Sequence, residues 1–173
     1  SQALPQQAAE DPLMWASFLF AQSWMYRLEG RWSDSVNTIE KSAMLRKKSD
    51  APLLYAESRL QQGEFFLSAG DEEGSISVLS EVIEILRSRE AYHLLVPALM
   101  HIAHAYIRKR NGQQALKFLQ EAWQHAQISR EPSMMAPIAA AIAAASVLLR
   151  QSQEALRFAR IAAQWAQEGT PST

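Results

Sequence analysis

The sequence repeats itself with a period of 40 residues, and this period constrains the fold more than any other feature. Four segments open alike and four small residues recur at the same step: Asp11-Pro12-Leu13-Met14, Ala51-Pro52-Leu53-Leu54, Ala91-Tyr92-His93-Leu94 and Glu131-Pro132-Ser133-Met134, with Ser35, Ser75, Ala115 and Ala155. A large residue recurs as Tyr26, Phe66 and Tyr106, and the fourth repeat has Ser146 in its place. Such a period marks a stack of small units, each packed against its neighbours.

Each unit is predicted to be two helices joined by a tight turn, because apolar residues recur at helical spacing and no segment alternates like a half-buried strand. The sequence therefore predicts an all-α fold, a right-handed α-solenoid of four antiparallel helical hairpins. The predicted boundaries are a leader over 1–11, one repeat domain over 12–168, and a flexible tail over 169–173. The four units are expected at about 12–51, 52–91, 92–131 and 132–168.

Turn and cap residues divide each unit. Glycine tolerates the left-handed conformation that ends many helices, so turns are expected at Gly30, Gly70 and Asn111-Gly112. Ser33, Asp71, Asn111 and Ser152 are the expected N-caps of the helices that follow. Pro97 and Pro137 also lie 40 residues apart, and because a proline inside a helix costs about 3 kcal/mol, we expect helices to start there.

The composition argues against several classes of partner. Lys+Arg number 17 and Asp+Glu 18, so nothing in the charge favours direct binding to nucleic acid or to an anionic membrane. The absence of cysteine removes disulfides and thiolate metal sites and suits a cytoplasmic location. The first residues, beginning at Ser1, do not form a signal peptide, and the chain is expected to be a fragment of a larger regulatory protein.

Residues 132–149 carry no charge and approach the length of a spanning helix. Alanines dominate this stretch, which makes it only modestly hydrophobic, and it falls in register with the repeat. We therefore expect a buried helix, packed between the third unit and the last helix.

The units resemble the tetratricopeptide repeat, which places small residues where its two helices cross and large residues between them. The matching positions cover roughly 12–168 and are Ser23, Tyr26, Gly30, Ser35 and Ile39; Gly63, Phe66, Gly70, Ser75 and Leu79; Ala103, Tyr106, Ala115, Leu119 and Ala122; Ala143, Ser146, Ala155, Ala159 and Ala162. The typical unit has about 34 residues, and Trp15 lies outside the family's tryptophan register. The longer period resembles repeats of LuxR-type ATP-dependent transcriptional activators, where a repeat superhelix takes part in effector sensing.

No motif in the sequence indicates an enzyme. There is no phosphate-binding glycine loop and no G-x-S-x-G nucleophile pattern. His101 and His104 lie three residues apart on one predicted helix, but two ligands do not make a metal site. The basic runs Arg46-Lys47-Lys48 and Arg108-Lys109-Arg110 fall at predicted helix ends, where the helix dipole explains them. We expect no catalytic activity, no metal and no cofactor.

The first helix of each unit is expected to line a concave wall. The residues predicted to contact a partner there are Phe20, Trp24, Arg27, Glu57, Gln61, Glu64, His101, His104 and Arg108. An aromatic group beside charges is typical of a peptide-anchoring surface, although Phe20 and Trp24 would serve equally to pack against a preceding repeat. The predicted function is a protein- or peptide-binding scaffold whose partner is a polypeptide, an adjoining domain, or a second copy at an exposed stack end. The alternative is a small-molecule effector sensor within a transcriptional activator.

Overall fold

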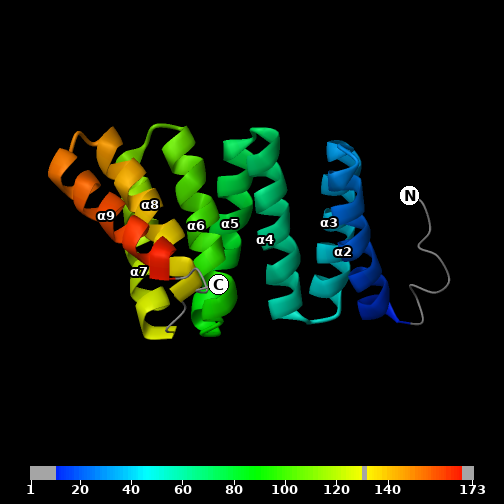
Figure 1. Ribbon diagram of the computed structural model, residues 1–173. Helices are drawn as coiled ribbons and strands as arrows, with labels where there is room; N and C mark the ends of the chain where they lie inside the picture. Colours follow the sequence, from blue (N-terminus) through cyan, green and yellow to red (C-terminus); the bar gives the residue numbers. More distant parts are fainter. Residues whose placement is uncertain (1–10, 130–131, 169–173) are drawn as a thin grey trace. The chain divides into compact units, whose positions relative to one another are not determined.

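A computed structural model describes residues 11–129 and 132–168 of the chain. These residues form eight α-helices and no strand (Figure 1). The helices are α2 (Pro12–Leu28), α3 (Trp32–Lys48), α4 (Pro52–Ala69), α5 (Glu72–Ser88), α6 (Tyr92–Arg108), α7 (Gly112–Ser129), α8 (Pro132–Leu148) and α9 (Ser152–Glu168). The predicted fold class, an all-α solenoid built of helical hairpins, is confirmed.

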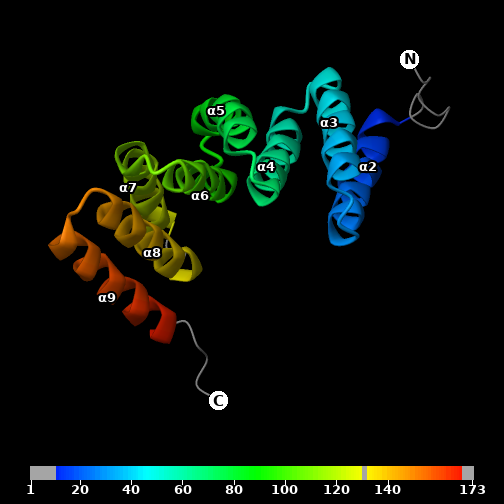
Figure 2. The same ribbon diagram turned by 90° about the horizontal axis from the view of Figure 1, so that it is seen from above.

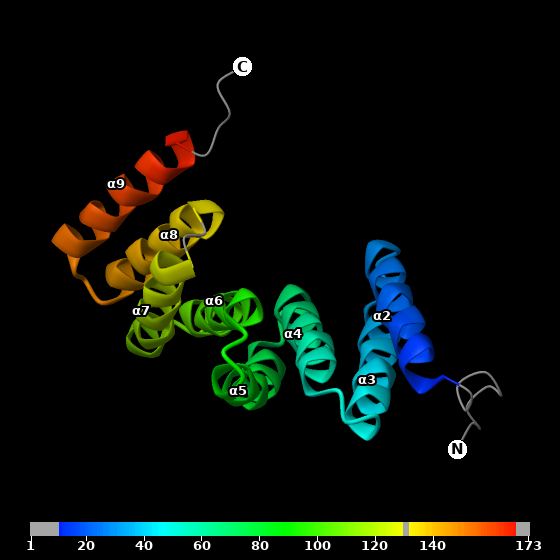
Figure 3. The same ribbon diagram turned by 90° about the horizontal axis from the view of Figure 1, so that it is seen from below.

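The helices fall into two compact units, which we describe separately. The first unit holds α2 to α5, where each helix packs against the next, and ends at Arg89. The second holds α6 to α9, with the same sequential packing and a further contact between α6 and α8. Figures 2 and 3 show α2 beside α3 and α8 beside α9. The single repeat domain over 12–168 stays a prediction, and the leader and tail lie outside the described residues, apart from Asp11.

The helices begin 40 residues apart, as the repeat predicts. First helices start at residues 12, 52, 92 and 132, and second helices at 32, 72, 112 and 152. Asp71 caps α5 by accepting a hydrogen bond from the Gly74 amide at 2.8 Å, and Asn111 accepts one from the Gln114 amide at 3.1 Å. The expectation that Ser33 and Ser152 are caps was wrong. Both lie within helices, because α3 begins at Trp32 and α9 begins at Ser152 itself.

The turn inside each hairpin contains one residue with a left-handed backbone. Gly30 and Gly70 have this conformation, and so do Arg110 and Arg150 at the equivalent positions, with φ of 57° and 58°. The third turn was predicted at Asn111-Gly112, but its left-handed residue is Arg110. Gly112 instead begins α7 against α8, where a Cβ atom would lie 2.8 Å from the carbonyl oxygen of Ala145. Close helix approach, not backbone conformation, requires glycine there.

Pro97 and Pro137 were predicted to start helices, and this was wrong. Each lies inside its helix, at the sixth position of α6 and of α8. The missing amide breaks one hydrogen bond of the helix ladder. Apolar packing on either side compensates, since Val96 and Ala98 are buried beside Pro97, and Ile138 is buried beside Pro137.

The small residues of the repeat lie where helices cross. Ser35, Ser75 and Ala115 are fully buried, and Ala155 is 7% exposed. On α4, a Cβ atom at Gly63 would lie 2.6 Å from Cγ of Leu79 on α5, so the glycine lets these helices touch. The repeat positions therefore build the core, because only small side chains allow helices to approach this closely.

The uncharged stretch forms α8, which packs against α6, α7 and α9. Its buried side chains include Met135, Ile138, Ala139, Ile142 and Ala145, whereas Val147 is 64% exposed. One face of this helix is therefore buried, and the expectation that the whole stretch is buried was too broad, because Pro137, Ala140 and Ala144 are exposed along with Val147. None of the helices in the described part of the chain is long and apolar enough to span a bilayer.

Candidate functional site

The predicted wall residues of the first unit lie together on α2 and α4, and we call this surface the α2–α4 wall: Phe20, Trp24, Arg27, Glu57, Gln61 and Glu64. Arg27 of α2 forms an ion pair with Glu64 of α4, with 3.2 Å between Nη2 and Oε1. The same guanidinium lies 4.8 Å from the centre of the Trp24 ring, and Trp24 packs edge-on against the buried Phe65. The predicted aromatic and charged groups therefore touch one another directly.

A second arginine, Arg46 of α3, completes this wall and was not predicted as part of it. Its guanidinium lies 4.7 Å from the ring centre of Phe20 and bonds Glu57 and the Leu54 carbonyl oxygen, each at 2.9 Å. Burial lowers the pKa of Arg46, and the charge of Glu57 opposes that shift. The side chain passes from the end of α3 beneath α4, so its place at a helix terminus concealed this role in the sequence.

Gln61 differs from the other wall residues because its side chain is 4% exposed. Its Nε2 atom donates a hydrogen bond to Ser23 Oγ at 3.2 Å, which ties α4 to α2. Gln61 is therefore an internal tie and offers little surface to a partner. The charges of the wall also neutralise each other, through Arg27 with Glu64 and Arg46 with Glu57.

The remaining predicted contact residues, His101, His104 and Arg108, follow one another along α6 in the second unit. His101 is half-buried, whereas His104 and Arg108 reach solvent. Burial lowers the pKa of His101. Burial also lowers the pKa of His104, and the nearby positive charges of His101 and Arg108 lower it further. Both rings therefore favour the neutral form, and across the described residues no three His, Cys, Asp or Glu side chains gather as metal ligands.

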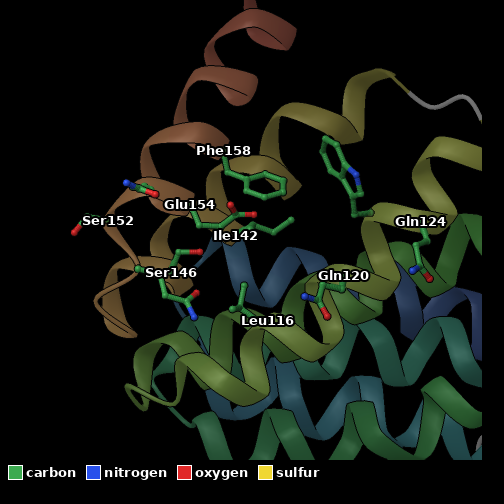
Figure 4. Close-up of a pocket in the computed structure, with 11 residues that line it drawn as sticks. Leu116, Gln120, Gln124, Ile142, Ser146, Ser152, Glu154 and Phe158 are labelled. Atoms are coloured by element: carbon green, nitrogen blue, oxygen red, sulfur yellow. The ribbon is translucent and has the colours of Figure 1, made fainter.

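The second unit contains a groove of about 860 Å³ bounded by α7, α8 and α9, which we call the α7–α9 groove (Figure 4). Its lining residues are Leu116, Gln120, Trp123, Gln124, Ile142, Ser146, Gln151, Ser152, Gln153, Glu154 and Phe158. The glutamines and Ser152 are exposed, so the groove is open to solvent. Figure 4 shows Phe158, Glu154 and Ile142 converging on one side, opposite Leu116 and Gln120 of α7.

Both aromatic and polar groups line this groove. The Trp123 and Phe158 rings meet edge to face with their centres 5.7 Å apart. Arg157 lies beside them, 5.6 Å from the Phe158 ring centre and 3.5 Å from a carboxylate oxygen of Glu154. At the floor, Ser146 is fully buried, and within the described part of the chain its hydroxyl has no hydrogen-bond partner.

The groove coincides with an irregularity in the repeat of large aromatic residues. In the third hairpin, Tyr106 of α6 fills the equivalent place, where its ring stacks on Phe118 of α7 with centres 5.8 Å apart. Forty residues later the same two positions hold Ser146 and Phe158. A serine leaves unfilled the space that the tyrosine ring occupies. Sequence reasoning noted the change at Ser146 but did not predict the groove.

Comparison with solved structures finds similar folds, and the matching proteins include three of low sequence identity. Aspartyl phosphate phosphatase F from Bacillus subtilis has a TM-score of 0.83 and 15% identity, with coverage of 91% of this chain and 42% of that chain. BtubC (BKLC) from P. vanneervenii has a TM-score of 0.84 and 14% identity, with coverage of 99% and 70%. A Rap protein complexed with Competence and Sporulation Factor has a TM-score of 0.75 and 18% identity, with coverage of 88% and 43%.

The chain thus spans less than half the length of the phosphatase and of the Rap protein. At these identities the similarity shows the fold alone, an all-helical repeat. No protein-family model and no curated protein matches the sequence.

Proposed function

We propose that this chain is a non-catalytic helical-repeat scaffold that binds a polypeptide in the α7–α9 groove. The observation that carries the proposal is the groove itself, an open channel of about 860 Å³ with an aromatic pair and a row of glutamines. Aromatic side chains in a pocket supply most of the affinity in many protein interfaces. Glutamine amides both donate and accept hydrogen bonds, which matches the backbone of an extended peptide.

The open form of the groove favours a polypeptide over a small effector. Small-molecule sites usually enclose most of the ligand surface. Here five lining residues are exposed, namely Gln120, Gln124, Gln151, Ser152 and Gln153. The hypothesis of a polypeptide-binding scaffold is therefore better supported than the hypothesis of a small-molecule sensor in a LuxR-type activator.

The α2–α4 wall is a weaker candidate for the main contact. Its two arginines already form ion pairs, and a partner charge would have to compete with Glu64 and Glu57 for them. Trp24 is half-buried against Phe65 and Arg27, so part of its surface is already used. Binding there would replace existing contacts, whereas the groove offers unfilled space.

The proposal extends to the setting of the chain. A cytoplasmic location suits the absence of cysteine, and a place within a larger regulatory protein suits a repeat module with an open groove. The structural neighbour that holds Competence and Sporulation Factor supports the idea that this fold receives partners. Adjoining domains of the same protein are included among the polypeptides that the groove would accept.

The test is selection of dodecapeptides from a displayed library on the immobilised chain, followed by fluorescence polarisation with synthetic peptides. Loss of an aromatic anchor typically weakens binding about tenfold or more, so Phe158→Ala should do so. Gln120→Arg, which fills the groove from an exposed position, should have a similar effect. Gln127→Ala, exposed on α7 outside the groove, is the matched control and should change affinity less than about twofold.

Circular dichroism of each variant separates lost binding from lost fold. If Trp24→Ala abolishes binding while Phe158→Ala and Gln120→Arg bind normally, the α2–α4 wall is the site and the groove proposal fails. The scaffold function itself is contradicted if no peptide is selected, or if substitutions in the groove and in the α2–α4 wall leave the affinity of every selected peptide unchanged.

A further inference from the structure

We infer that the α7–α9 groove is specific for an aromatic side chain with a polar tip, namely a tyrosine of the bound polypeptide. This inference rests on the proposed function and adds the identity of the anchoring residue. Its basis is the comparison of the third and fourth hairpins at the repeat position of the large aromatic residue. Tyr106 occupies that position in the third hairpin and Ser146 in the fourth.

The repeat shows what this space is built to hold. In the third hairpin the Tyr106 ring lies nearly parallel to Phe118, with an angle of 9° between the planes. In the first hairpin the equivalent ring is that of Tyr26. The guanidinium of Arg31, which follows the turn, lies over this ring at 4.2 Å from its centre. The equivalents in the fourth hairpin, Phe158 and Gln151, both line the groove. The groove therefore keeps the surroundings of an aromatic ring without the ring.

The buried hydroxyl at the floor selects among aromatic side chains. Ser146 is fully buried, lines the groove, and has no hydrogen-bond partner among the described residues. The side chain of Tyr106 extends from the backbone of α6. A ring of a bound peptide would enter the fourth hairpin from solvent, in the opposite direction, so its far end would point into the protein. A tyrosine would thus bring its hydroxyl to Ser146 Oγ and satisfy a group that is costly to leave unpaired. A phenylalanine would stack on Phe158 but leave Ser146 unpaired.

The experiment is an NMR titration of the ¹⁵N-labelled chain with three amino-acid amides: N-acetyl-tyrosinamide, N-acetyl-phenylalaninamide and N-acetyl-leucinamide. The tyrosine amide should shift the Trp123 indole N–H and groove amides, with a Kd smaller than that of the phenylalanine amide by about threefold or more. The leucine amide should bind most weakly. Ser146→Ala should remove the difference between tyrosine and phenylalanine amides, and Ser146→Tyr should abolish binding by filling the space.

Thermal unfolding shows whether Ser146→Tyr remains folded, and Phe158→Leu provides a second variant that removes the stacking surface. The inference is overturned if the leucine amide binds as well as the tyrosine amide, if Ser146→Ala leaves the preference intact, or if none of the amides shifts the groove. Library peptides that bind the groove through an aliphatic residue would overturn it while leaving the proposed function in place.

A second inference comes from two exposed apolar faces, and we infer that copies of this chain associate head to tail through them. The α2 end face consists of Met14, Phe18, Met25 and Leu28, which are 51–83% exposed and spaced along one side of the helix. The α9 end face consists of Ala159, Ala162 and Ala166, all partly or largely exposed.

Equivalent positions in the other repeats show which kind of helix packs against each face. The positions of Phe18 and Met25 correspond to Ser58 and Phe65 on α4, which are fully buried, and α4 packs on the preceding helix α3. Ser58 accepts a hydrogen bond from Arg46 of α3 at 2.9 Å, which confirms the direction of this side. In the second unit the same positions are Ile138 and Ala145 of α8, which packs on α7.

The α9 end face is the other half of the same type of contact. Its positions correspond to Ile39, Ser42 and Arg46 of α3 and to Leu119, Ala122 and Ala126 of α7, all of which are buried. The chain therefore exposes one first-helix face and one second-helix face that interior hairpins bury against each other. Large residues on α2 would meet alanines on α9, so the volumes are complementary. In this heterologous contact the α2 end face of one copy covers the α9 end face of a second copy, and each copy keeps one face for a further contact.

The experiment is sedimentation equilibrium of the full chain and of two variants, Phe18→Asp and Ala162→Glu, each in an exposed or half-exposed position. The wild type should form concentration-dependent oligomers, and each variant alone should be monomeric because one face is blocked. An equimolar mixture should form a heterodimer and nothing larger, because one intact α2 face meets one intact α9 face. At about 0.5 mM even a weak association would be visible, so a wild type that is monomeric at this concentration would overturn the inference. So would dimers of Ala162→Glu alone, or a mixture that stays monomeric.

Discussion

Arg46 Nη1 lies 2.9 Å from Glu57 Oε2, and the side chain of Arg46 is 4% exposed whereas that of Glu57 is 39% exposed. The arginine is therefore the buried partner, held by Glu57, by Ser58 and by a backbone carbonyl of α4. All three acceptors lie 2.9 Å from the same atom, Arg46 Nη1. This pairing joins the end of the first hairpin to the second.

Arg46→Met should destabilise the first unit by about 1–3 kcal/mol, because Ser58 and the Leu54 carbonyl lose a buried donor. Arg46→Lys should recover only part of that loss. Arg31→Ala is the control, since its ion pairs are half-exposed and screened by solvent and should contribute little to stability. Urea unfolding gives the free energies, and equal losses for Arg46→Met and Arg31→Ala would contradict the assignment of Arg46 as a buried tie.

Ala115→Leu should destabilise the chain by roughly 1–3 kcal/mol through overpacking. Ala115 is fully buried at the repeat position where α6 and α7 meet. Ala140→Leu, at an exposed position of α8, is the matched control and should be nearly neutral. Calorimetric melting measures both, and a stable Ala115→Leu variant would remove the basis for treating the small residues as helix crossings.

Gly112→Ala should also destabilise, by about 1–3 kcal/mol, because a Cβ atom there approaches the Ala145 carbonyl oxygen. By contrast, the exposed neighbour Gln113→Ala should have little effect. A crystal structure of Gly112→Ala should show α7 displaced from α8. Wild-type stability with unchanged helix spacing would show that the close approach is not required.

Acidification should weaken the third hairpin. The folded-state pKa values of His101 and His104 lie below the ordinary value of 6.5, so the unfolded chain binds more protons near that pH. Stability should therefore fall as pH decreases below about 6.5, a direction fixed by the lowered pKa values. His101→Gln should reduce the pH dependence of Tm between pH 7.5 and 5.5, and His93→Gln on the same helix controls for the substitution. A Tm that rises on acidification would contradict the account.

The repeat predicted the fold because its signals are local. Pro12, Pro52 and Pro132 each begin a helix, as the repeat predicts. The small residues of the repeat mark the positions where helices cross. The errors came where packing overrides local preference. Pro97 and Pro137 stay inside helices because their neighbours are buried, and Gly112 serves an approach between helices that no turn rule foresees.

The candidate site was harder to predict because it depends on distant contacts. The residues of the α2–α4 wall meet as the register suggested, but pairing by Arg46 and the burial of Gln61 depend on the fit of three helices. The α7–α9 groove arises from a missing side chain. Ser146 carried that signal in the sequence, and its consequence becomes visible only when Tyr106 and Phe118 are seen to stack.

Hydrogen–deuterium exchange with and without a library-selected peptide tests the central claim most directly, because it maps the bound surface without any substitution. We predict that the peptide slows exchange in the segments that line the groove, 116–124 and 142–158, and leaves α2 and α4 unchanged. Protection confined to α2 and α4, with unchanged exchange around the groove, would contradict the claim that the last hairpin of this chain holds the polypeptide.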